Sequence, residues 1–382
     1  MDQDVSSQLI KQAPPGDGRP ASAGSAAVGV QMAIHPQDEM YLFTLQKLQN
    51  ARLGRQQYAR QGLRIATTFE RIADWCFPAA SSTPTLLDFA SGHGRATRFL
   101  AAHCGADRVW VSDIKEDAVA FCRSNFGVRG FVSTTVPEEL KIEERFDLIF
   151  VSSLFSHLPR HLFHGWLLTL TRLLETGGVL AFSVHDSEMV NASLMPADGY
   201  LFVPQSESRV LNADLYGTSY AANEFVVDAI RKAFGADVFI RCLPKGLCRA
   251  QHLYIASRDP TRRVESIPPG ADLVGYVDTC ALAQGGQLQV TGWAACHDPA
   301  DPVEWVTLEI DGVPIAQSAT QSLRPDVAAA FANPAFARSG FDVRLGIHEP
   351  FSDKRLLQVT AQTLRGARDV LFVSQLSELT AG

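Results

Sequence analysis

Short apolar runs alternate with amphipathic segments over residues 84–258, and this alternation limits the possible folds more than any other feature of the sequence. The runs read TLLDFA, RVWVSDI, GFVST, FDLIFVSS and GGVLAFSVHD. The segments between them, residues 95–103, 115–125 and 160–175, carry apolar side chains at helical spacing. This order is typical of βαβ units, so the sequence predicts an α/β domain with a Rossmann-like, mostly parallel sheet.

Two further runs, DVFIRCL and AQHLYIASR, follow a helical segment at residues 221–235. They lie close together in the sequence, which favours an antiparallel pair. With these two runs the predicted sheet has seven strands.

The pattern changes on both sides of this sheet. Residues 1–35 are rich in Pro, Gly, Ala and Ser and predict a flexible leader. Residues 36–257, which begin with helical spacing, are expected to form the first domain with an N-terminal helical lid. Charge and proline replace periodicity at residues 258–271, which predicts a linker. Residues 272–382 show short strands with turn signals and predict a second, all-β domain, an immunoglobulin-like β-sandwich.

The composition argues against several classes of protein. The chain has 46% hydrophobic and 20% charged residues, as soluble globular proteins do. A net charge of −7 disfavours a nucleic-acid partner, and no apolar run approaches the roughly 20 residues that span a bilayer. Seven cysteines without a C-x-x-C pair are expected to be reduced thiols. No secretory signal is visible at the N-terminus, so the expected location is cytoplasmic.

The loop after the first run, Ser91-Gly92-His93-Gly94, joins a strand to a helix, where three kinds of ligand compete. A P-loop needs Lys and then Ser or Thr after the second glycine, but Arg95-Ala96 stands there. A dinucleotide fingerprint needs a third glycine or an alanine, and neither reading frame supplies it well. The remaining ligand, S-adenosylmethionine, carries an ammonium and a sulfonium group and no phosphate.

Two carboxylates suit this cationic ligand. Asp88 closes the first run, where it would repel a pyrophosphate but can receive an amino group. Asp113 closes the second run, where it can accept both ribose hydroxyls. For each acid a helix cap or a surface position is the alternative, and the glycines could serve only to relieve crowding at the turn.

The ordered segments LLDFASGHGR, VSDI, FDLIFVSSLFSHLP and GGVLAFSVHD resemble the class I S-adenosylmethionine-dependent methyltransferases. The resemblance covers roughly residues 80–257. That family reads D/E-x-G-x-G-x-G, whereas Ala90 stands here in the first glycine position. We expect Ala90 to have a negative φ, which alanine accommodates. The resemblance implies methyl transfer, with S-adenosylmethionine as the cofactor.

The resemblance also assigns a cofactor site by position. The methionine moiety would be lined by Asp88, Ala90, Ser91, Gly92 and Gly94. The ribose and adenine would be held by Asp113 and Ile114, with Ser133 also at the adenine. The sulfonium and the acceptor would be flanked by Ser152, Ser153 and Leu154. Thr134 is the alternative to Ser133. Tyr58, on the predicted lid, is a further candidate for the cofactor carboxylate, with packing against the sheet as its alternative.

A hydroxyl acceptor requires a base, and an imidazole titrates in the right range. The catalytic candidates follow the fourth and fifth runs: His157, and His185 with Asp186. A structural role in its loop is the alternative for His157. The cluster His157, His161 and His164 could suggest a metal site, but Pro159 interrupts the helix and no Glu or Cys completes the set, so no metal is expected.

The connection at residues 187–220 is long enough to recognise an acceptor. Its aromatic residues suit stacking on a sugar or, alternatively, a small core of the loop itself: Tyr200, Phe202, Tyr216 and Tyr220.

The C-terminal segment resembles a β-sandwich module of bacterial surface-polysaccharide enzymes, on the residues Gly292-Trp293, Asp311-Gly312, Arg324-Pro325-Asp326-Val327 and Ser339-Gly340-Phe341. This resemblance implies a saccharide or glycan-precursor acceptor and a partner enzyme bound through the module; a passive packing domain is the alternative. The expected function is O-methylation of a sugar or other hydroxyl on such a glycan. A small-molecule or natural-product methyltransferase and a noncatalytic methyltransferase-like scaffold remain alternatives.

Overall fold

The computed structural model describes residues 29–78, 84–205, 211–270, 272–283, 286–347 and 354–379. Within these ranges the chain forms two compact units. The α/β unit contains residues 33–39 and 61–269, and the C-terminal unit contains residues 40–60 and 270–382 together with residues 29–32. This division differs from the predicted boundaries, because residues 40–60, expected in the lid of the first domain, group with the C-terminal unit.

The α/β unit is built on a nine-stranded, mostly parallel sheet. Its parallel part runs in the order β3 (Arg129–Val132), β2 (Val109–Asp113), β1 (Leu86–Phe89), β4 (Phe146–Val151) and β5 (Leu174–Asp186). β9 (Gln251–Ser257) pairs antiparallel with β5 and with β8 (Phe239–Leu247). The predicted mixed α/β architecture and the antiparallel pair at its end are confirmed.

The sheet has nine strands rather than the predicted seven because the long connection after β5 contains a hairpin. The hairpin consists of β6 (Tyr200–Val203) and β7 (Thr218–Ala221). β7 pairs with His185 and Asp186, beyond Val184, the last residue of β5 that pairs with β9. The hairpin therefore pairs with the two residues of β5 that extend beyond β9. This free edge exists only once the sheet has formed, so local sequence patterns do not reveal it.

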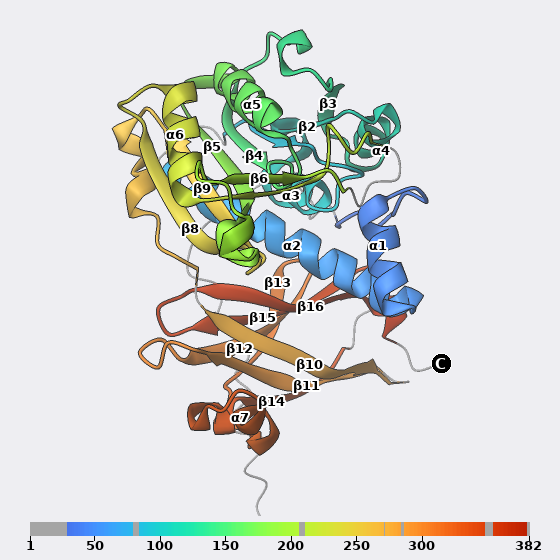
Figure 1. Ribbon diagram of the computed structural model, residues 1–382. Coiled ribbons are helices and arrows are strands. Elements are labelled where there is room, and N and C mark those ends of the chain that lie inside the picture. The colour runs from blue at the N-terminus through green and yellow to red at the C-terminus, as the bar shows by residue number, and fades with distance from the viewer. Residues whose placement is uncertain are drawn as a thin grey trace, which may run out of the picture. The chain divides into compact units, whose positions relative to one another are not determined.

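Helices cover both faces of this sheet (Figure 1). α5 (Arg160–Arg172) and α6 (Asn223–Phe234) contribute Trp166 and Val226 to a buried cluster that includes Ile149 of β4. Neighbouring side chains on a strand point to opposite faces, so Phe150 lies on the other side, where it meets Phe69 of α2 (Ala51–Cys76) at 4.7 Å between ring centroids.

α2 and α3 (Thr97–Cys104) approach each other closely at Gly62. A Cβ at this position would lie 2.1 Å from the carbonyl oxygen of Arg95, so only glycine fits. The contact sets the distance between α2 and the start of the helix that follows the glycine loop. α4 (Glu116–Phe126) is the next helix in this part of the unit.

Two segments that composition marks as irregular are ordered against the α/β unit. Arg98 Nη1 donates to the carbonyl oxygen of Ala33 at 2.8 Å, and His35 stacks on His93, so residues 33–35 are not a free leader. The rest of the predicted leader, up to residue 28, lies outside the described residues. The predicted linker forms two 3-10 turns and buries Val264 and Ile267.

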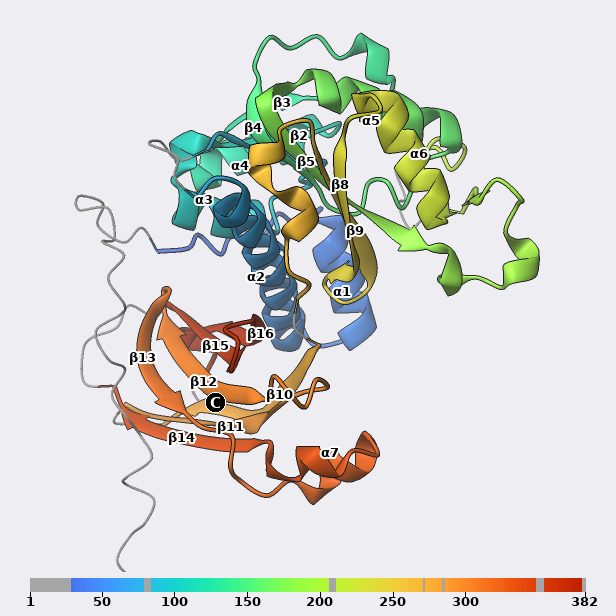
Figure 2. The ribbon, with the colours of Figure 1, turned by 90° about the vertical axis from the view of Figure 1, so that its left-hand side faces the viewer.

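The C-terminal unit contains two antiparallel sheets. One consists of β10 (Leu273–Leu282), β11 (Gln287–Cys296) and β14 (Gly340–Gly346), and the other of β13 (Val313–Ser318), β12 (Val303–Ile310), β15 (Leu356–Thr363) and β16 (Arg368–Gln375). Figure 2 shows the two sheets one over the other, and their buried side chains form one hydrophobic cluster. A short helix, α7 (Pro325–Ala330), separates β13 from β14 in the sequence.

The N-terminal helices contribute to this unit through α1 (Glu39–Leu48) and the first part of α2. Arg60 Nε donates to the carbonyl oxygen of Val370 at 3.1 Å, and Gln56 Nε2 donates to Ser374 Oγ at 3.1 Å. Among the described residues, no helix combines the length and apolarity that crossing a membrane requires.

Candidate functional site

The loop that follows β1 contains three residues in the left-handed region. Ala90 has φ +59°, Gly92 has +55° and Gly94 has +74°. The expectation of a negative φ at Ala90 is therefore wrong. The conformation is held from outside the loop, because the Ser91 amide donates to the carbonyl oxygen of Ser112 at 3.1 Å and the Gly92 amide donates to Asp113 Oδ2 at 2.9 Å.

Ala90→Gly is expected to raise the free energy of unfolding by about 1 kcal/mol, because a Cβ in the left-handed region costs more than the added chain entropy of glycine. Urea denaturation of both proteins measures this difference. Gly127→Ala is the matched reverse change: Gly127 has φ +69° and its Cβ would meet its nearest neighbour at an ordinary 3.7 Å. It should lower the stability by a similar amount. An Ala90→Gly protein no more stable than the wild type would contradict strain at Ala90.

The two glycines of the loop have different surroundings. A Cβ on Gly92 would meet no atom within 4 Å, whereas a Cβ on Gly94 would lie 2.5 Å from the Phe126 ring and 2.8 Å from Cys122 Sγ. Gly94 thus permits α4 to pack closely against the loop. Gly92 leaves open space where a ligand can approach the backbone.

Asp88 is buried at the end of β1, with 3% of its surface exposed. Thr97 Oγ1 donates to Asp88 Oδ2 at 2.7 Å. Burial raises the pKa of Asp88 to about 6. A cationic group placed against this carboxylate would favour its ionised form and gain a strong interaction in return.

Asp113 closes the next strand and organises the backbone around it. Its Oδ1 accepts from the Lys115 amide at 3.0 Å and its Oδ2 accepts from the Gly92 amide at 2.9 Å. Burial raises the pKa of Asp113, and these two amide donors oppose that rise. Each oxygen keeps a second lone pair, so the carboxylate can still accept a pair of hydroxyl groups.

The remaining predicted cofactor residues divide into two groups. Ile114 follows Asp113 directly, and the Ser133 amide donates to the carbonyl oxygen of Asp113 at 2.9 Å, so both lie beside the acid. Tyr58 groups with the C-terminal unit, where its fully buried ring lies edge-on to Tyr41 at 5.8 Å. This ring contact fits the packing alternative for Tyr58, whose assignment to the cofactor carboxylate stays a prediction.

Residues 152–154 follow β4 at the same edge of the sheet. Ser153 is left-handed with φ +64°, and its amide donates to Ser183 Oγ of β5 at 2.9 Å. Ser152 is half-buried beside it, and Leu154 packs against the main hydrophobic cluster. These contacts connect the ends of β4 and β5.

Two residues of the segment between β6 and β7 contact the His157 ring. Its Nδ1 lies 2.7 Å from the carbonyl oxygen of Gly217, which can only accept, so Nδ1 carries the proton. The ring stacks on Tyr216 at 4.7 Å. Burial lowers the pKa of His157, so the ring is neutral at pH 7 with a lone pair on Nε2.

Asp186 contacts a histidine of another strand. Asp186 Oδ2 lies 2.7 Å from Nε2 of His252, on β9. The His185 ring lies 5.8 Å from the His157 ring and 5.6 Å from the Tyr220 ring. Two of the three predicted catalytic residues, His157 and His185, are thus neighbours.

Sequence reasoning missed Gln251 and His252, at the start of β9. Gln251 contacts Ser153, Ser183 and His185. An antiparallel strand begins at the edge where the parallel strands end, so its first residues join the site. The predicted antiparallel pair was therefore the available signal.

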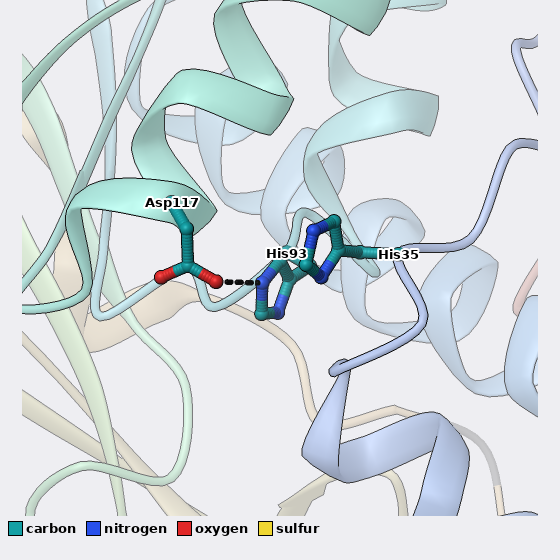
Figure 3. A group of neighbouring side chains, drawn as sticks. All are labelled: His35, His93 and Asp117. Carbon is teal, nitrogen blue, oxygen red and sulfur yellow. Dashed lines mark hydrogen bonds and ion pairs between the residues drawn. The ribbon is translucent and has the colours of Figure 1, made fainter.

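Among the described residues, one His/Cys/Asp/Glu group has the composition of a metal site: His35, His93 and Asp117 (Figure 3). His93 Nε2 lies 3.2 Å from Asp117 Oδ2, and the Gln37 amide donates to His35 Nδ1. The two rings are stacked at 4.3 Å with only 5° between their planes, so their in-plane lone pairs run parallel and do not meet at one ion. The stacking of His35 on His93 connects residues 33–39 to the glycine loop.

A family model described as "Methyltransferase domain" matches residues 86–178. No curated protein matches the chain. Solved structures that resemble it include an O-methyltransferase family 2 protein from Planctomyces limnophilus in complex with apigenin, at 16% identity and a TM-score of 0.39. This match covers 59% of the present chain and 63% of that protein.

For two other solved structures, the match extends over most of the solved chain. An S-adenosylmethionine-dependent methyltransferase from Clostridium acetobutylicum matches at 15% identity and a TM-score of 0.37, over 51% of this chain and 90% of that one. The glycopeptide N-methyltransferase MtfA in complex with S-adenosylmethionine matches at 17% identity and a TM-score of 0.38, over 52% and 95%.

Proposed function

We propose that this chain, whose residues 86–178 match a family model described as "Methyltransferase domain", uses S-adenosylmethionine to transfer a methyl group to a hydroxyl of a saccharide-containing acceptor. The acceptor class that we propose is a bacterial surface glycan or its precursor, methylated in the cytoplasm. One observation supports methyl transfer above all: the buried Asp88 and the half-buried Asp113 lie at the ends of neighbouring strands, and a neutral imidazole follows the next strand at the same edge of the sheet.

The residues at β1 and β2 fit the cofactor. The Asp88 carboxylate is suited to the ammonium group, and the free lone pairs of Asp113 are suited to the ribose hydroxyls. Open space at Gly92 permits close approach to the backbone. When bound, S-adenosylmethionine supplies an electrophilic methyl group; the protein supplies the placement and the charge.

His157 is the residue best suited to remove the acceptor proton. Its Nδ1–H bond to Gly217 fixes the ring orientation, and its Nε2 lone pair is available for a hydroxyl proton at neutral pH. We propose His185 as a second contact of the acceptor and Asp186 as the partner that orients His252.

The hairpin after β5 supports a flat or ring-shaped acceptor. Tyr216 stacks on His157 and Tyr220 lies beside His185, and both rings are half-buried. Tyr200 is buried, and its hydroxyl donates to the carbonyl oxygen of Leu158 at 2.6 Å, so it belongs to the core. We propose the C-terminal unit, as a β-sandwich module, for binding glycan or a partner enzyme.

Isothermal calorimetry with S-adenosylmethionine, followed by a methyl-transfer assay on an acceptor panel, tests the proposal. We expect saturable binding, and transfer to sugars or sugar nucleotides but not to amines. Transfer to small phenols alone would indicate a small-molecule acceptor instead of a glycan. A folded protein that does not bind the cofactor would be a noncatalytic scaffold.

A further inference from the structure

We propose that Gln251 is a positioning residue of the acceptor site, whose side-chain amide holds His185 as the tautomer with its proton on Nδ1. Of the two neighbouring rings, His157 then provides the lone pair on Nε2 that can accept the acceptor proton, whereas Nε2 of His185 is already engaged. The part that concerns His157 rests on the methyl transfer proposed above. The tautomer of His185 follows from hydrogen bonds alone.

Ser183 determines which way the Gln251 amide faces. Ser183 Oγ accepts from the Ser153 amide at 2.9 Å, so its own proton points elsewhere. The Gln251 side chain lies 2.6 Å from Ser183 Oγ. A hydroxyl that donates requires an acceptor, so the amide oxygen Oε1 lies there and also accepts from Ser153 Oγ at 3.1 Å.

The amide nitrogen of Gln251 consequently faces Ser156 and His185. Ser156 Oγ donates to the carbonyl oxygen of Ser153 at 2.8 Å, so it can accept from Gln251 Nε2 at 3.4 Å. The other neighbour of this nitrogen is His185 Nε2, at 3.2 Å. An amide nitrogen only donates, so His185 Nε2 presents its lone pair and the neutral ring carries its proton on Nδ1.

The two histidines therefore carry their protons on the same nitrogen, Nδ1, and differ in what their Nε2 lone pairs face. A carbonyl oxygen fixes the proton of His157 on Nδ1 and leaves its Nε2 lone pair to the site. The amide of Gln251 occupies the Nε2 lone pair of His185. A proton on His185 Nε2 would place two N–H groups against each other, so Gln251 opposes its use as a base at that atom. Asp186, the next residue, does not contact Gln251 in this arrangement but lies with its Oδ2 2.7 Å from His252 Nε2.

Imidazole nitrogen NMR of the full-length protein labelled with ¹⁵N-histidine tests this assignment, with His185→Gln used to identify the signals. We expect the Nδ1–H tautomer for His185 in the wild type. In Gln251→Glu an oxygen faces His185 Nε2, so the ring should change to the Nε2–H tautomer or the imidazolium. Gln287→Glu is the control, because it adds the same charge at an exposed position of β11 and should change nothing.

A wild-type His185 in the Nε2–H form, or a tautomer that does not respond to Gln251→Glu, would overturn the proposal. Gln251→Leu, which cannot hydrogen-bond, serves if the glutamate variant does not fold, and it should release His185 to the Nε2–H form. With an acceptor in hand, Gln251→Leu should lower kcat by about 10- to 100-fold while the Kd of S-adenosylmethionine stays within about twofold.

The two proposals fail separately. Absence of methyl transfer with a confirmed Nδ1–H tautomer would refute the enzymatic function and leave the role of Gln251 intact. Active protein with the other tautomer would refute only the role of Gln251.

Discussion

Asp113→Ala is expected to weaken S-adenosylmethionine binding by about 100-fold or more, because the carboxylate is assigned two hydrogen bonds to the ribose, each worth about 1.5–3 kcal/mol when the acceptor is charged. The same change removes the acceptor of the Gly92 and Lys115 amides, which shape the loop. Calorimetric titration of the full-length variant measures the loss.

Asp107→Ala is the matched control, because its side chain in the same unit is 81% exposed. It should bind the cofactor as the wild type does. Asp113→Asn keeps the shape of the side chain, but it replaces one carboxylate oxygen with an NH₂ group that would face the backbone N–H of Gly92 or Lys115. Binding by Asp113→Ala equal to that of the wild type, in a folded protein, would refute the assignment of the ribose to this edge.

His157→Gln is expected to lower the methyl-transfer rate by about 10²- to 10⁴-fold, the range that a positioned general base contributes. Cofactor binding should remain, because His157 follows β4 in a different loop from the glycine residues. The assay is kcat on a hydroxyl acceptor, with calorimetry of the cofactor alongside. His161→Gln, at an exposed position on α5, is the control.

The pH dependence gives an independent readout for His157. A base must be neutral, and burial lowers the pKa of this imidazole from its usual value near 6.5. The wild-type rate should therefore be constant at neutral pH and fall only as the pH drops through a pKa below that value. This acidic limb should disappear in His157→Gln. A variant with the wild-type rate and profile would assign His157 a structural role.

Much of the α/β unit follows from local sequence. The alternation of apolar runs and helical segments predicts most of the strands of this unit. The acids at the ends of β1 and β2 are also predictable, because the carboxyl ends of parallel strands meet at one edge. The hairpin β6–β7 is not, since each strand has four residues and its partner edge on β5 is far away in the chain.

The backbone of the glycine loop shows a different limit. The sequence places Ala90 where the motif of the class I methyltransferases that it resembles has glycine, and alanine normally avoids a positive φ. Hydrogen bonds from Ser91 and Gly92 to residues of the β2 strand nevertheless impose it. These two hydrogen bonds, one of them to a carboxylate, together outweigh a local preference of about 1 kcal/mol.

By itself, the sequence determined the α/β class, the acids at the ends of β1 and β2, and the two histidines near the ends of β4 and β5. Apolar periodicity and strand ends are local properties, so they can be recognised without a structure. Only the tertiary structure decided that Asp186 pairs with His252, that Gln251 lies against His185, and which nitrogen of each histidine carries its proton. Gln251 and His185 are 66 positions apart, and such contacts depend on how β5 and β9 pair, which no local pattern encodes.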